Sequence, residues 1–411
     1  MRMKSTLYFT LTAALLVFTG CATKQPLETP LGQSSFEEYE AETRAWIAEK
    51  RHFVMKDHEK ELDYHTPFEI YPNRKPDKGI LLIHGLGDSP WTYRDLAPKL
   101  AEQGFLVRTV LLPGHGTKPA DMIGVTSEDW NRAVEEQVAL LKKDVPNVWL
   151  GGFSTGGNLA YSYASKDQDI QGMILFSPAL EIRTKLVGLV PIADLFIDWL
   201  RKPDKKTQGV LPFKYGTIPM DGLNAFKDTM DSADKALKEK KYDKPVLVMM
   251  SANDSIVDTQ SLLKLFDKQL TNPNSKIIWY GELPKNIGSL SSKVIAKKTF
   301  LPDERIETFS HMALTYSPEN EWYGRNGKYR YCVNRSVKGY YEKCMAAPEV
   351  WYGAYGTVDG DKMFARLTYN PYFFSQLEEM AKVFNGASSK LAPNSILEKI
   401  TPVAASSENN N

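Results

Sequence analysis

Apolar residues in this chain follow two patterns that alternate along the sequence. Short runs that are apolar throughout are typical of strands buried in a parallel sheet. Such runs lie at residues 79–84, 106–112, 148–153, 172–177, 245–250 and 276–280. Segments with the apolar spacing of helices lie at residues 35–54, 93–104, 127–143, 156–161 and 373–384. Strands that alternate with helices predict an α/β fold with a doubly wound, mostly parallel sheet.

One connection in this series is too long to be a simple crossover. Residues 181–244 separate two of the predicted strands and contain an apolar part at 186–200 followed by a charged end. A connection of this length predicts an inserted helical cap.

The overall composition is that of a globular protein with balanced charge. Charged residues make up 25% of the chain, and the formal net charge is +1. No stripe of basic residues interleaved with aromatic ones is present, so we expect no nucleic-acid partner.

The first residues form a separate segment. A basic start is followed by an apolar stretch at 7–18, which is too short to span a bilayer, and then by Phe-Thr-Gly before Cys21. This segment resembles the signal peptide of bacterial lipoproteins, in which the cysteine receives a diacylglycerol. The alternative is an ordinary secretory signal with a coincidental cysteine. We expect a signal peptide at 1–20, lipid on Cys21, a tether at 21–34, and anchoring in the cell envelope, at the outer membrane.

The chain has three cysteines, an odd number. If Cys21 carries lipid, Cys332 and Cys344 remain as a pair that can form a disulfide in an exported protein. The alternative is two free buried thiols. No histidine lies near either cysteine in the sequence, so we expect no metal site there.

The stretch GGFSTGGN at residues 151–158 raises the question of catalysis. Gly152, Ser154 and Gly156 match the nucleophile elbow, in which a serine occupies a sharp turn between a strand and a helix. The predicted strand before Ser154 and the predicted helix after it supply that context. Glycines on either side are expected because such a turn is crowded. The alternative is a glycine-rich turn with an incidental serine.

A nucleophilic serine needs a histidine as its base and a carboxylate to orient that histidine. With the elbow the expected chain order is serine, acid, histidine. Of the six histidines only His311 follows Ser154, so His311 is the candidate base. Asp254, just past the strand at 245–250, is the candidate acid, whereas Asp258 is better placed to cap the next helix.

Backbone N–H groups are expected to form an oxyanion hole. One should belong to Thr155, directly after the serine, and the other to Leu86 in the loop HGLGDSP. We interpret His84 and His115 as residues that organise these loops rather than as bases.

Four stretches together resemble one family: LLIHGLGDSPWTYRDLAPKLAEQGFLVRTVLLPGHG, SEDW, GGFSTGG and VLVMMSAND. They are similar to the α/β-hydrolases of the bacterial carboxylesterase and monoacylglycerol lipase branch, closely over 79–182 and moderately over 244–285. The resemblance implies the α/β-hydrolase fold and hydrolysis of carboxylic esters through an acyl-enzyme, with no metal or cofactor. Ser154, Asp254 and His311 match the family's triad, and Leu86 and Thr155 match its oxyanion positions.

Two features depart from the family. Asp254 and His311 are about twice as far apart in the sequence as the family's acid and histidine usually are, which indicates an insertion at about 282–305. A short strand is expected at 305–309, just before His311. A Tyr- and Trp-rich extension at about 317–372 also follows the histidine, and we expect it to line the substrate site.

These observations predict a lipid-anchored serine hydrolase acting on short- or medium-chain acyl esters or monoacylglycerols. Its partners would be a small ester or lipid substrate and the membrane that holds the anchor. Thioesterase or peptidase activity on the same triad is the enzymatic alternative. A catalytically inert surface binding protein on the same fold is the alternative outside enzymes.

Overall fold

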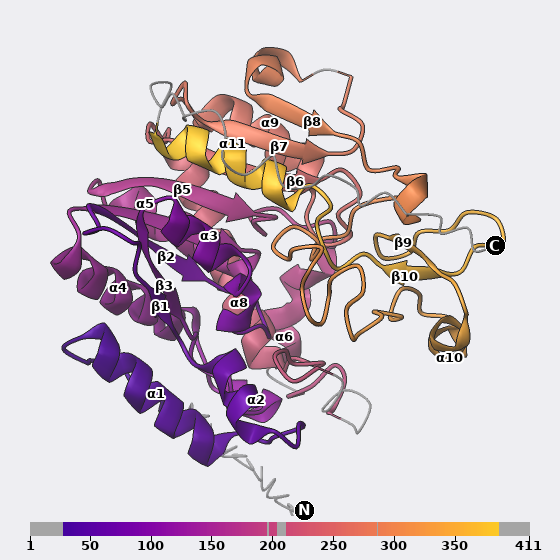
Figure 1. Cartoon of the computed structure of the whole chain (residues 1–411), viewed down its shortest axis with the longest axis horizontal. Coiled ribbons are helices and arrows are strands. Elements are labelled where there is room, and N and C mark those ends of the chain that lie inside the picture. The colour runs from indigo at the N-terminus through magenta and orange to yellow at the C-terminus, as the bar shows by residue number, and fades with distance from the viewer. Residues whose placement is uncertain (1–27, 195–196, 204–210, 286, 386–411) are drawn as a thin grey trace, which may run out of the picture.

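The computed structural model describes residues 28–194, 197–203, 211–285 and 287–385 (Figure 1). The predicted signal peptide, Cys21 and the first half of the predicted tether, up to residue 27, lie outside the described residues. No helix within the described ranges has the length and apolarity needed to cross a membrane.

The centre of the fold is an eight-stranded sheet in the order β1-β3-β2-β4-β5-β6-β7-β8. Every neighbouring pair is parallel except β1 with β3, so the predicted α/β class with its mostly parallel sheet is confirmed. The strands are β1 (Glu69–Ile70), β2 (Lys78–Ile83), β3 (Phe105–Val110), β4 (Asn147–Phe153), β5 (Ile170–Phe176), β6 (Val246–Ser251), β7 (Lys276–Tyr280) and β8 (Val294–Lys297). The apolar runs of β2 to β7 are buried because helices cover both faces of the sheet.

Two apolar cores occupy the two faces of the sheet. One contains side chains of α1, α4, α5, α8 and α9, and the other contains side chains of α3, α11 and the C-terminal extension. The α-helices are α1 (Phe36–Lys50), α2 (His58–His65), α3 (Leu96–Glu102), α4 (Ser127–Asp144), α5 (Thr155–Lys166), α6 (Val190–Asp194), α8 (Met220–Glu239), α9 (Thr259–Gln269), α10 (Tyr340–Ala346) and α11 (Phe373–Asn385). Short 3₁₀ helices are η1 (Pro90–Tyr93), η2 (Pro119–Met122), η3 (Lys185–Leu189), η4 (Gly288–Ser292) and η5 (Pro302–Glu304).

Side-chain caps define where several helices begin. Ser35 caps α1, and Thr126 forms a capping box with Asp129 at the start of α4. Asp258 accepts a hydrogen bond from the Ser261 N–H and caps α9, the role expected for it from the sequence. The carboxylate of Asp258 is therefore committed to a helix terminus.

The two long segments outside the core fold in different ways. Residues 181–244 contain η3, α6 and α8, and α8 packs on α5 (Figure 1). The extension contains α10 and a small parallel sheet of β9 (Trp351–Gly353) and β10 (Phe364–Arg366). A disulfide joins Cys332 to Cys344, with an S–S distance of 1.99 Å.

The expected strand at 305–309 is wrong. Only Ile306 forms bridges, to Leu301 and to Tyr352, and the rest of this segment is irregular. The physical reason is that its partners are a turn and the extension, so no neighbouring strand of the main sheet is available for a regular ladder.

Candidate active site

Ser154 lies at the turn between β4 and α5 with φ 54° and ψ −114°, a backbone conformation that L-residues rarely adopt. A Cβ added at Gly152 would lie 2.2 Å from the Gly156 oxygen, and one at Gly156 would lie 1.9 Å from the Ile83 oxygen. Glycine is therefore required on both sides of the turn. This tight packing projects Ser154 from the end of β4 beside the loop that follows β2.

The structure brings together the three residues of the predicted triad. The Ser154 Oγ lies 3.1 Å from His311 Nε2, and His311 Nδ1 lies 2.7 Å from Asp254 Oδ2. The His311 side chain is 15% exposed and that of Asp254 is 0% exposed. Ser154 and His311 are thus both partly exposed, while the acid is shielded from water.

The environment of Asp254 favours its charged form. Burial alone would raise the pKa of this carboxyl, but the His311 imidazole and the Val257 and Ile256 N–H groups outweigh burial and hold the pKa below its ordinary value. Asp254 Oδ1 accepts both N–H bonds, at 2.9 Å from Val257 and 2.8 Å from Ile256. The carboxylate is therefore ionised at neutral pH and fixed to hold the Nδ1–H of His311.

The two N–H groups expected at the oxyanion hole are available. Among the hydrogen bonds found within the described residues, none uses the N–H of Leu86 or of Thr155 as donor. Thr155 N–H is one of the orphan donors of the first turn of α5. Neither group is therefore committed to another acceptor, as the expected oxyanion role requires.

Two buried histidines fix the loop that carries Leu86. His84 Nε2 accepts from Leu112 N–H at 3.1 Å, and its Nδ1–H donates to Gly85 O at 2.8 Å. His115 Nε2 accepts from Gly87 N–H at 2.9 Å. Burial lowers the pKa of His84 to about 4 and that of His115 to about 3, so both rings are neutral at pH 7. The structure thus gives them loop-organising contacts, and His311 is the histidine that contacts Ser154.

Residues 213–215, in the long connection between β5 and β6, contact the same loop. Tyr215 N–H donates to Gly87 O at 2.7 Å, and the Ser89 hydroxyl donates to Phe213 O at 2.8 Å. The Lys214 ammonium lies 3.3 Å from the carboxylate of Asp88. These contacts fix the loop after β2 to residues 213–215.

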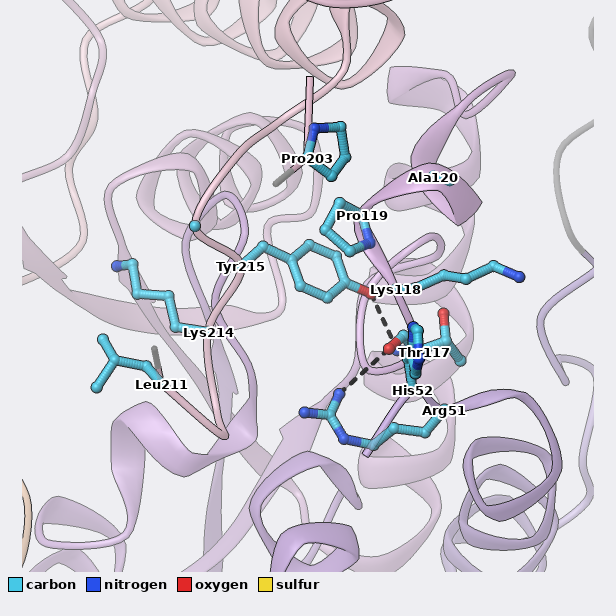
Figure 2. A pocket seen from close by; sticks show the side chains of 11 residues that line it. Arg51, His52, Thr117, Lys118, Pro119, Ala120, Pro203, Leu211, Lys214 and Tyr215 are labelled. Atoms are coloured by element: carbon cyan, nitrogen blue, oxygen red, sulfur yellow. Dashed lines mark hydrogen bonds between the residues drawn. The ribbon is translucent and has the colours of Figure 1, made fainter. Parts of the chain in front are cut away.

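A residue that the sequence did not single out, Arg51, links the N-terminal helices to this region. Its guanidinium pairs with Glu61 at 2.6 Å and donates to the main-chain oxygens of Gly116 and Pro212 at 2.8 and 2.9 Å. Figure 2 shows the guanidinium and the Tyr215 hydroxyl converging on Thr117, beside a cavity of about 70 Å³. No sequence motif marks Arg51, because its partners come from distant parts of the chain.

The extension forms one wall of a groove beside the acid. This groove, of about 560 Å³, lies between residues 252–255 and residues 354–357, with Arg183 and Gln260 also lining it. The disulfide contacts a separate apolar cluster with Val350 and Ala365, which contains no triad residue. Within the described part of the chain, no group of three or more His, Cys, Asp or Glu residues is placed to hold a metal ion.

The fold and this site together define a serine hydrolase with an α/β-hydrolase architecture. Residues 74–213 match the family described as "Serine aminopeptidase, S33". The chain is 30% identical over 184 residues to a thermostable monoacylglycerol lipase of Bacillus sp. (strain H-257), covering 44% of this chain and 71% of the lipase. The chain therefore belongs to this family of α/β-hydrolases.

Two further similarities are more distant. The chain is 24% identical over 212 residues to a carboxylesterase of Bacillus subtilis (strain 168), covering 50% of this chain and 83% of the esterase. The solved monoacylglycerol lipase of Paleococcus ferrophilus is 21% identical, with a TM-score of 0.41, over 52% of this chain and 87% of that chain.

Proposed function

We propose that this protein is a lipid-anchored serine hydrolase that cleaves carboxylic esters with short or medium acyl chains, including monoacylglycerols. The observation that carries the proposal is the continuous path from Asp254 through His311 to Ser154, with contacts of 2.7 and 3.1 Å. The names of the relatives, a monoacylglycerol lipase and a carboxylesterase, support the ester as the substrate.

The reaction follows from the geometry in two half-cycles. His311 Nε2 takes the proton of the Ser154 hydroxyl as Oγ forms a bond to the ester carbonyl carbon. The N–H groups of Leu86 and Thr155 stabilise the resulting oxyanion, and His311 returns the proton to the alkoxy oxygen as the C–O bond to the alcohol breaks. A water then gives a proton to His311 Nε2 as its oxygen attacks the carbonyl carbon of the acyl-enzyme. His311 returns this proton to Ser154 Oγ as the bond between Oγ and the carbonyl carbon breaks, which releases the acid and restores the serine.

Three exposed leucines in the long connection between β5 and β6 support an apolar substrate. Leu186, Leu189 and Leu200 are 71%, 56% and 68% exposed. In this proposal their side chains meet the acyl chain of a substrate that partitions into membranes.

A fluorophosphonate probe tests whether Ser154 is activated. Wild type should label rapidly, whereas Ser154→Ala and His311→Ala should not. Asp254→Asn and Asp258→Asn form a matched pair. Asp254→Asn should slow labelling at least about 10²-fold, because it disturbs the imidazole. Asp258→Asn keeps a good helix cap and should label like wild type. A folded wild type that fails to label would favour the inert binding protein.

A substrate series then identifies the bond and the chain length. We expect turnover of p-nitrophenyl esters with short and medium chains and of monoacylglycerols, with a burst that reports the acyl-enzyme. If matched thioesters or peptide amides were turned over faster than the esters, the substrate class would be a thioester or an amide instead of an ester.

The lipid anchor is tested by metabolic labelling with a fatty-acid analogue. Wild type should incorporate the analogue and fractionate with the outer membrane, and Cys21→Ser should do neither. Incorporation that survives Cys21→Ser would overturn the anchor.

A further inference from the structure

We infer that the C-terminal extension positions His311, and that Thr308 is the positioning residue through which it acts. The inference rests on the proposed function, because it concerns the base of the same reaction. It also explains how a histidine so far along the chain from Asp254 can reach the site.

The segment that leads to His311 has little regular structure of its own. After β7 the chain adds β8 and η5, and residues 305–310 then run back to the site with a single bridging residue, Ile306. A segment without a hydrogen-bonded ladder is held mainly by its neighbours. The position of His311 therefore depends on what residues 305–310 contact.

Most of those contacts are with the extension. Glu307 N–H donates to Tyr352 O at 2.8 Å, and Tyr352 N–H donates to Arg305 O at 2.8 Å. The Ser310 hydroxyl, one residue before the histidine, donates to Leu367 O at 2.5 Å. β9 and the residue after β10 thus take the place of a neighbouring strand of the main sheet.

Thr308 is the centre of a closed ring of hydrogen bonds. Its Oγ1 accepts from Ala354 N–H at 2.9 Å and lies 3.0 Å from Thr357 Oγ1, which in turn donates to Ala354 O at 2.9 Å. Because the Thr357 proton is used on Ala354 O, Thr308 must be the donor between the two hydroxyls. A Cβ at Gly353 would lie 2.7 Å from Thr357 Oγ1 and 3.0 Å from Thr308 Oγ1, so glycine at 353 leaves room for the ring.

The opposite side of the segment is held by the sheet. The Ser251 hydroxyl, at the end of β6, donates to Phe309 O at 2.8 Å, and the Phe309 ring stacks on Tyr280 at 4.9 Å. Residues 308–310 are therefore held by the extension on one side and by β6 and β7 on the other. These contacts set the direction in which the His311 imidazole leaves the backbone. They thereby align the imidazole between Asp254 and Ser154.

The disulfide stabilises the part of the extension that makes these contacts. Cys332 and Cys344 pack with Val350, next to β9, and with Ala365 in β10. The covalent link thereby braces the two short strands that face residues 305–310.

Thr308→Val tests the inference, because valine keeps the shape and removes the hydroxyl. We expect kcat on a p-nitrophenyl ester and the rate of fluorophosphonate inactivation to fall about ten-fold, with KM within about two-fold, since small misplacements of a catalytic group affect mainly the chemical step. Thr308→Ser restores the hydroxyl and should recover most of the wild-type rate. Thr357→Val removes the second hydroxyl of the ring and should lower the same two rates. It provides a second test if Thr308→Val folds poorly.

Thr109→Val is the matched control. Thr109 is buried, and its Oγ1 accepts from Phe68 N–H at 2.9 Å and donates to Phe68 O at 3.2 Å, so valine removes a comparable pair of hydrogen bonds at another part of the sheet. We expect a comparable change in melting temperature and an unchanged inactivation rate. Equal losses in Thr308→Val and Thr109→Val, or wild-type rates in both Thr308→Val and Thr357→Val, would overturn the positioning role. A folded wild type that shows no hydrolysis and no labelling would instead contradict the proposed hydrolase function.

Discussion

The buried ion pair between Arg51 and Glu61 allows a quantitative prediction about the N-terminal helices. The two side chains are 5% and 0% exposed, and their contact is 2.6 Å. Glu61 also accepts from the N–H groups of Val54 and Met55. Glu61→Gln keeps the size of the side chain but leaves the guanidinium buried without a counter-ion. Removing one partner of a buried pair costs about 3–5 kcal/mol, so we expect a loss of this size in the free energy of unfolding.

Urea unfolding followed by tryptophan fluorescence measures this loss, with Glu59→Gln as its control. Glu59 is on the same helix and pairs with Arg44 at 2.8 Å, but its side chain is 79% exposed. Exposed pairs contribute less than about 1 kcal/mol, so this variant should remain close to wild type. If Glu61→Gln lost no more stability than Glu59→Gln, the buried pair would not be what fixes the N-terminal helices to Gly116 and Pro212.

Three further predictions concern pH, the disulfide and the elbow. Folding lowers the pKa of His84 from 6.5 to about 4 and that of His115 from 6.5 to about 3. As the pH falls, the two histidines of the unfolded chain therefore bind protons at a higher pH than those of the folded protein. Stability should therefore fall as pH drops below about 6.5, by up to about 1.4 kcal/mol per pH unit for each ring; equal unfolding free energies at pH 7 and 5 would contradict this. Replacing Cys332 and Cys344 by alanine should lower the free energy of unfolding by roughly 2–3 kcal/mol, measured in urea, because the link closes a short loop; an unchanged urea midpoint would argue against it. Gly156→Ala places a Cβ 1.9 Å from a main-chain oxygen at the end of β2, so fluorophosphonate labelling should be lost; labelling at the wild-type rate would refute the crowding of the elbow.

The parts of the fold that could be predicted have local signals. β2 to β7 are apolar runs, and the glycines around Ser154 mark the elbow within a few residues. Asp254 and His311 were predicted from chain order and from the position of a strand end. The structure places His311 against Ser154 and Asp254 against His311, although these residues are far apart in the sequence.

The parts that could not be predicted depend on distant contacts. β1 and β8 are too short to show a pattern, and the contact of Arg51 with Pro212 joins residues 161 positions apart. Thr308 and Thr357 are 49 positions apart, and isolated threonines in polar loops carry no periodic signal. The expected strand at 305–309 failed for the same reason, since a strand needs a partner that the local sequence does not reveal.

The hydrogen bond from Ser310 to Leu367 also has a consequence for protein synthesis. The two residues are 57 positions apart, so at about 5–20 residues per second the ribosome adds Leu367 about 3–11 s after Ser310. During this interval the nascent chain already contains Ser154, Asp254 and His311. The extension residues that contact the segment before His311 are still incomplete. With the proposed positioning, a chain that ends between 311 and 367 carries every reacting group but lacks the contacts that align His311. Such products should hydrolyse esters more slowly than the full chain.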